Sequence, residues 1–102
     1  MKLVTITWKA FGKPADATIM FDIDDKVSDL QLCEALFAST NTRSGWMWDA
    51  IQRFMPAVRT HTALSVGDEI DIDGSIYRCA GIGWEHVTTY TTDNFVLSER
   101  DR

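Results

Sequence analysis

The sequence predicts an α+β protein, with an N-terminal β-hairpin, two helices and then a C-terminal antiparallel sheet of three or four strands. Three observations predict this class. Apolar and polar residues alternate over 3–8 and 68–73, which is the period of a half-buried strand. Between these stretches, apolar residues recur at helical spacing over 28–55. An Asp-Gly pair follows the second alternating stretch and is typical of a two-residue hairpin turn.

The first predicted strand covers residues 3–8, and its apolar face holds Val4, Ile6 and Trp8. A second strand over 17–23 aligns Ile19, Phe21 and Ile23. The residues from Phe11 to Pro14 contain the Gly and Pro of a turn. We therefore expect these two strands to pair as a hairpin with a long loop.

The first predicted helix begins at Ser28. Ser28 and Gln31 have the spacing of a capping box, in which each side chain bonds the other residue's free backbone N–H. The buried stripe of this helix is predicted to be Leu32, Cys33, Leu36 and Phe37. Ser39 to Thr42 should end it, with Asn41 as a left-handed C-cap residue.

The second predicted helix runs from Gly45 to Met55, with Ser44 as its N-cap and Pro56 as its stop. One apolar face is expected to hold Met47, Ile51, Phe54 and Met55. Trp46 and Trp48 lie about 200° apart around a helix, so at least one of them should be peripheral.

The Asp73-Gly74 turn fixes a register for the C-terminal hairpin. It pairs Ile72 with Ser75, Ile70 with Tyr77, and Glu69 with Arg78 on the solvent side. Residues 84–90 and 94–97 can each add a strand. We expect a single domain over 1–97 and a frayed polar tail at 98–102.

The chain has 102 residues and a net charge of −5. Its Lys and Arg residues are spread out, which argues against direct binding to nucleic acid. Acidic residues cluster over 22–29 and 68–73. Such clusters serve solubility, or they engage a basic partner, and mimicry of DNA stays open as an alternative.

Two cysteines, Cys33 and Cys79, are expected to be small buried side chains, although a disulfide is possible. The N-terminus alternates in character and lacks the continuous apolar stretch of a signal peptide, and no apolar run is long enough for a bilayer. These observations predict a cytoplasmic protein with no membrane partner.

The sequence contains no recognised catalytic, metal or nucleotide motif. Cys79 and His86 lie six residues apart without a CxxC beside them, and Asp22 to Asp25 lacks the Gly and Glu of a calcium loop. No phosphate-binding Gly motif or G-x-S-x-G elbow occurs. We predict no catalytic residue, metal or cofactor, and a protein that is not an enzyme.

One irregular stretch, Arg59 to Asp68, carries no helix or strand period. It is either a structural lead-in to the hairpin, with hydroxyls and Asp68 bonding backbone donors, or a surface loop that presents Arg59 and His61 to a partner. The peripheral Trp of the second helix is either edge packing or a binding anchor.

The motifs T-N-x-x-x-G-x-x-W over 40–48, R-T-H-T-x-L-S-V-G-D over 59–68 and D-G-x-x-Y-R-C-x-x-x-G-W over 73–84 resemble a group of small proteins encoded by actinobacterial phages and plasmids. The S-V-G-D core is also similar to a segment of the YodL-like domain of mobile-element proteins. The resemblance covers residues 30–85 and implies a setting rather than an activity.

These observations lead us to expect a phage or mobile-element accessory protein that binds a host or element protein. The candidate contact residues are Asn41, Trp48, Arg59, His61 and Asp68. Two alternatives stay open, a nucleic-acid-related protein and an unrecognised small enzyme. A pocket holding His61 with a carboxylate and a poised hydroxyl would favour the enzyme.

Overall fold

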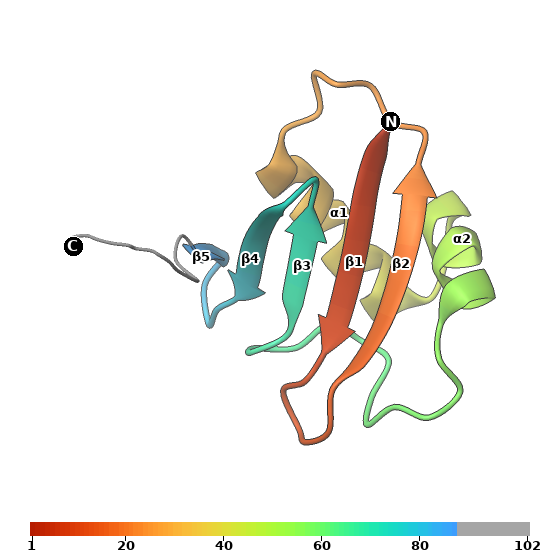
Figure 1. Ribbon diagram of the computed structural model, residues 1–102, viewed down its shortest axis with the longest axis vertical. Coiled ribbons are helices and arrows are strands. Elements are labelled where there is room, and N and C mark those ends of the chain that lie inside the picture. The colour runs from red at the N-terminus through yellow and green to blue at the C-terminus, as the bar shows by residue number, and fades with distance from the viewer. Residues whose placement is uncertain (88–102) are drawn as a thin grey trace.

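A computed structural model describes residues 1–87. Over these residues five strands form one antiparallel sheet in the order β2-β1-β3-β4-β5, with both helices behind it (Figure 1). The strands are β1 (Lys2–Trp8), β2 (Ala15–Phe21), β3 (Glu69–Ile72), β4 (Ser75–Cys79) and β5 (Trp84–Val87). The helices are α1 (Asp29–Thr42) and α2 (Trp46–Phe54). The predicted α+β class is confirmed, and the C-terminal strands extend the N-terminal hairpin in the same sheet.

The core lies between the sheet and the two helices. β1 pairs with β2 on one side and with β3 on the other, which confirms the N-terminal hairpin. Alternation along each strand sends one set of side chains toward the helices. The fully buried members of this set include Val4, Ile6, Trp8, Ile70 and Ile72, and they meet Leu32, Cys33, Leu36 and Ile51 from the helices.

Helix α1 begins as predicted. The Ser28 hydroxyl accepts a hydrogen bond from the Gln31 amide, and the Gln31 side chain accepts one from the Ser28 amide. The predicted C-cap is wrong, because α1 continues through Asn41 and the left-handed residue is Arg43, at φ 55°. Asn41 instead uses its side chain to donate to the Phe37 carbonyl.

Helix α2 differs from the prediction at both ends. Its N-cap is Gly45, with φ 93° and no side-chain cap, while the Ser44 hydroxyl bonds that of Thr42. Phe54 does not join the buried face, because its side chain is 56% exposed. Trp46 is 59% exposed, which confirms that one Trp is peripheral.

The C-terminal hairpin has the predicted register. Ile72 pairs with Ser75, Ile70 with Tyr77 and Glu69 with Arg78. The ion pair between Arg78 and Glu69 forms at 3.0 Å, but the Glu69 side chain is only 12% exposed. The pair lies on the face away from the helices, as predicted, and Lys9 also covers this carboxylate, at 3.0 Å.

One hydrogen bond ties the start of α1 to the sheet. The Tyr77 hydroxyl donates to the Asp29 carboxylate at 2.6 Å, and the Lys2 ammonium lies 3.7 Å from the same carboxyl group. The bond to Asp29 raises the pKa of Tyr77 to about 12, because the phenol must stay protonated to donate.

Both cysteines are buried and free, as expected for small core side chains. Burial raises the pKa of Cys33 to about 12, and burial also raises the pKa of Cys79.

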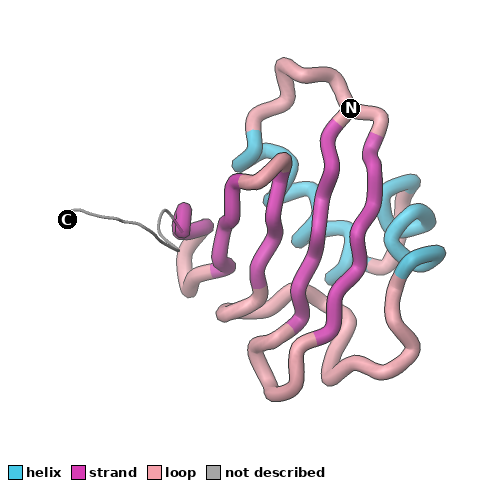
Figure 2. The backbone as a smooth tube through the Cα atoms, viewed as in Figure 1, coloured by secondary structure: helices cyan, strands magenta, loops and turns pink. Residues whose placement is uncertain are grey.

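The smooth backbone trace in Figure 2 shows the long connections at both ends of the sheet. Three C-terminal strands fall within residues 1–87, and β5 covers the first part of the predicted strand at 84–90. The predicted strand at 94–97 and the polar tail at 98–102 lie outside the described residues. In residues 1–87 no helix has the length and apolar character needed to cross a membrane.

Candidate functional site

The segment from Arg59 to Asp68 is organised around one buried carboxylate. Asp68 is 0% exposed, and its Oδ1 accepts hydrogen bonds from the amides of Lys9 and Ala10 at 2.8 and 2.9 Å. Its Oδ2 accepts from the Ser65 amide at 2.9 Å and bonds His61 Nε2 at 2.6 Å. Asp68 thus joins the end of β1, the irregular segment and the start of β3. This is the predicted structural use of Asp68.

His61 lies between this carboxylate and a hydroxyl. An ionised carboxylate can only accept hydrogen bonds, so with Asp68 ionised the bonded His61 Nε2 is the donor. In the neutral ring Nδ1 then accepts a hydrogen bond from the Thr60 hydroxyl, 2.6 Å away. Phe11 packs edge-on against the imidazole, with ring centroids 4.8 Å apart. The outcome is a hydroxyl, an imidazole and a carboxylate in series.

Arg59 folds back on its own segment. Its Nη1 donates to the Pro56 carbonyl at 2.9 Å, while Nε and Nη2 both donate to the Thr62 hydroxyl. The Thr62 carbonyl in turn accepts from the Trp8 indole at 2.8 Å. The guanidinium therefore closes the chain from Pro56 to Thr62 into a loop that is fixed to the core.

The end of α1 holds the same segment from the other side. The Leu64 amide donates to the Thr40 hydroxyl at 3.0 Å, and Asn41 Nδ2 lies 3.4 Å from the Leu64 carbonyl. Thr40 is fully buried. The sequence prediction did not name Thr40 and Thr62 as site residues. The run of hydroxyl residues around Leu64 could have pointed to Thr62, whereas Thr40 meets this segment only through the fold.

The structure thus brings four of the five candidate residues to one region and leaves one apart. Arg59, His61 and Asp68 share the irregular segment, and Asn41 reaches it through Leu64. Trp48 belongs to α2, where it is half-buried and packs against the core.

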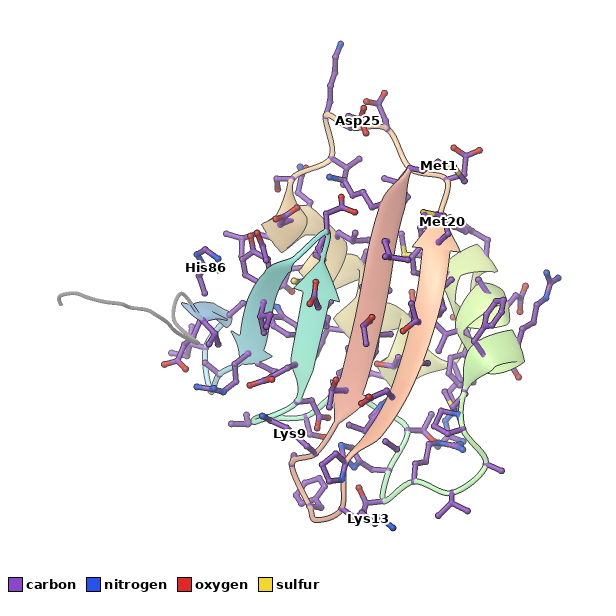
Figure 3. All side chains as sticks on the ribbon, in the orientation of Figure 1. Met1, Lys9, Lys13, Met20, Asp25 and His86 are labelled. Atoms are coloured by element: carbon purple, nitrogen blue, oxygen red, sulfur yellow. The ribbon has the colours of Figure 1, made fainter. Side chains whose placement is uncertain are left out.

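A groove adjoins this segment. Its volume is about 400 Å³, and it is lined by Lys13, Pro14, Ala15, Pro56, Val58, Arg59 and Thr60. Figure 3 shows Lys13 at the end of the sheet opposite Met1 and Met20. Thr60, whose hydroxyl bonds His61, is exposed and lines this groove.

A second exposed region is the face of the sheet that the helices do not cover (Figure 1). Cross-strand pairing places Leu3 directly beside Met20 on this face, and their side chains are 45% and 52% exposed. Asp73 lies on the other side of Leu3, whose amide donates to the Asp73 carboxylate at 2.9 Å. We call this side of the sheet, from β2 to β5, the open face.

The charges of the open face are mostly negative. The residues that the strand register and the turn place there include five carboxylates, those of Asp16, Glu69, Asp71, Asp73 and Glu85. Two cations, Lys9 and Arg78, accompany them, and both bind Glu69. The remaining polar residues are threonines, and the hydroxyls of Thr5 and Thr18 bond each other at 2.9 Å.

The arrangement of the side chains limits what the irregular segment and the open face can do chemically. Within residues 1–87, no three His, Cys, Asp or Glu side chains are grouped so as to hold a metal ion. A hydroxyl bonded to an imidazole that is bonded to a carboxylate is the arrangement that activates a nucleophile. The open face offers apolar contact beside negative charge.

Comparison with protein-family models, with curated proteins and with solved structures gives no match for this chain. The fold and the exposed groups therefore define the class: an α+β protein with a five-stranded antiparallel sheet, two helices on one face and an acidic, partly apolar open face.

Proposed function

We propose that this protein is a protein-binding module whose open face binds a basic partner protein. In the setting that the motif resemblance implies, the partner is a protein of the host or of the mobile element.

The observation that carries the proposal is the apolar pair Leu3 and Met20 on a face that neither α1 nor α2 covers. A sheet covered on one side ordinarily presents polar residues to water on the other. Large apolar side chains in adjacent positions there are informative, because contiguous exposed apolar groups with a polar rim mark interaction sites. Met1, 67% exposed, lies at the same end of the sheet (Figure 3).

Charge defines the kind of partner. Asp73 flanks Leu3, Asp71 follows one row further along, and Asp25 lies at the same end of the sheet. A partner with Lys or Arg around an apolar anchor would complement this surface, and the attraction would raise the association rate and weaken in salt.

Site-specific crosslinking tests this proposal. A photo-crosslinking amino acid at position 20 should capture a basic protein from a host lysate, whereas the same group at Gln52, an exposed position on α2, should not. Met20→Ser should lower the affinity for the captured protein about tenfold, as expected for losing a buried apolar anchor. Ile82→Ser is the matched control, because Ile82 is 97% exposed in the loop between β4 and β5.

Two results would contradict the proposal: capture of an acidic protein, or equal losses of affinity in the Met20 and Ile82 variants. Duplex DNA added to the complex identifies the partner surface. Release of the partner by DNA would mean that the open face occupies a DNA-binding surface, which is the mimicry alternative, whereas retention would mean a different basic surface.

A second candidate function is acyl transfer by Thr60, and the hydroxyl–imidazole–carboxylate series favours it. His61 would accept the Thr60 hydroxyl proton as the oxygen attacks an ester carbonyl, and would return the proton to the leaving alcohol. Water, giving its proton to His61, would then attack the acyl group on Thr60, which would leave as the acid as the Thr60 hydroxyl is restored. Hydrolysis of p-nitrophenyl acetate measures this directly. Rates equal for the wild type and Thr60→Val would eliminate this candidate.

A further inference from the structure

The groove beside the irregular segment combines apolar walls with positive charge. Pro14, Ala15, Pro56 and Val58 provide the apolar part, and Val58 is 86% exposed. Lys13 and Arg59 provide two cations, and no carboxylate lines the groove. The chain has a net charge of −5, so a groove whose charged lining residues are all positive is unusual.

Neither cation is neutralised within the described residues. None of the ion pairs formed in residues 1–87 includes Lys13 or Arg59. A guanidinium has five N–H donors, and the hydrogen bonds of Arg59 to Pro56 and Thr62 use one from each of its three nitrogens. The other N–H groups on Nη1 and Nη2 keep their capacity to bind a ligand.

The groove is also held in shape before any ligand arrives. Arg59 closes its own loop, Trp8 anchors that loop through Thr62, and Asp68 fixes the following residues to β1. Gly12, beside Lys13 in the same loop, adopts φ +136°, and a Cβ there would lie 3.7 Å from the Thr60 methyl group, at van der Waals distance. A pre-formed site loses little conformational freedom on binding, so more of the contact energy appears as affinity.

Size separates this groove from a second hollow, near Cys79. Pockets for small organic ligands have volumes of roughly 300–1,000 Å³, and the groove measures about 400 Å³. The hollow near Cys79 measures about 230 Å³ and is lined by Glu34, which disfavours an anion.

We propose that this groove binds a small organic anion that has an apolar body. The anionic group would bind Lys13 and Arg59, and the apolar body would lie on Pro14, Pro56 and Val58. A carboxylate and a phosphate monoester share this chemistry. The proposal is independent of the Leu3–Met20 pair, since Lys13 and Met20 lie at opposite ends of the sheet (Figure 3).

Three probes with similar bodies test the proposal in a titration followed by amide chemical shifts of the ¹⁵N-labelled full chain. The probes are 3-phenylpropionate, phenyl phosphate and the neutral 3-phenylpropanol. At least one anion should shift the amides of Lys13, Ala15, Val58, Arg59 and Thr60, and should bind about tenfold more tightly than the alcohol, as expected for a charge-assisted hydrogen bond. The tighter anion identifies the ligand class as carboxylate or phosphate.

Lys13→Gln separates this site from general attraction to cations. Lys13 is exposed in the loop between β1 and β2, so the variant should fold and should bind the preferred anion about tenfold more weakly. Lys26→Gln is the matched control, because Lys26 is an exposed lysine that does not line the groove. Equal binding of the alcohol and both anions, equal effects of the two substitutions, or shifts confined to other residues would each overturn the proposal.

Discussion

At the scale of single residues, the carboxylate of Asp68 has the largest structural consequence. It accepts hydrogen bonds from two amides at the end of β1, one amide of the irregular segment and the ring of His61. A buried carboxylate is tolerated only when such donors replace its hydration. If the carboxylate were removed, these amides and the His61 ring would lose the acceptor that they share.

Asp68→Ala is therefore expected to lower the free energy of unfolding by about 3–4 kcal/mol, because four partly buried donors lose their acceptor. Urea denaturation followed by circular dichroism measures the change. Asp16→Ala is the control: Asp16 is an exposed residue of β2, and its loss should change stability by less than about 0.5 kcal/mol. Similar midpoints for the two variants would contradict the role assigned to Asp68.

The buried thiols give a prediction that depends on pH. Burial raises the pKa of Cys33 from 9.0 to about 12. At pH 8 the fraction of Cys33 present as the reactive thiolate is therefore on the order of one in ten thousand. Iodoacetamide at pH 8 should modify the folded protein at least about a hundredfold more slowly than the urea-unfolded protein. Rapid modification of the folded chain, mapped to Cys33 by mass spectrometry, would contradict this burial.

The same shift determines the direction of the alkaline response. A thiol whose pKa is raised by folding favours the folded state while it is protonated in both states. That contribution is complete below pH 9 and is lost as pH rises from about 9 toward about 12, because only the unfolded chain then ionises. Tyr77, whose pKa is raised to about 12 by Asp29, acts in the same direction from pH 10 upward.

At the scale of elements, the two helices begin in different ways. Helix α1 has a complete capping box, whereas α2 begins at Gly45 without any side-chain cap. Ser28 and Ser44 both precede a helical apolar pattern, yet only Ser28 has a residue three positions later whose side chain bonds back. Ser44 bonds Thr42 at the end of α1 instead.

Ser28→Ala should reduce the free energy of unfolding by about 1 kcal/mol, the usual cost of losing an N-cap side chain. Ser44→Ala should reduce it by less than about 0.5 kcal/mol, because its hydroxyl contact is exposed. Chemical denaturation of both variants gives the comparison. A larger loss at Ser44 than at Ser28 would mean that Ser44 caps α2.

At the scale of the whole molecule, the sheet separates two chemical surfaces. Its covered side holds the core, while its open face carries five carboxylates, two cations and the Leu3–Met20 pair. The groove with Lys13 and Arg59 lies at the far end from Met1 and Met20 (Figure 3). A partner anchored on the Leu3–Met20 pair and a small anion in the groove would therefore contact opposite ends of the sheet.

The sequence by itself determined what depends on neighbouring residues. The alternation of Val4, Ile6 and Trp8, the Ser28–Gln31 cap and the Asp73-Gly74 register were predictable, because their causes are contained in a few consecutive positions. The local pattern gave wrong predictions for the cap roles of Asn41 and Ser44 and for the burial of Phe54. The conformation and exposure of these residues depend on how the neighbouring elements pack against them.

Only the tertiary structure decided how distant segments meet. The pairing of β3 with β1 brings Asp68 beside Lys9 and Ala10, nearly 60 positions earlier in the chain, and sets His61 between a carboxylate and a hydroxyl. The placement of the helices is also a tertiary property: Leu3 and Met20 stay exposed because both helices pack on the other face. Periodicity shows that a strand has two faces, but which face is covered depends on where the chain places its helices.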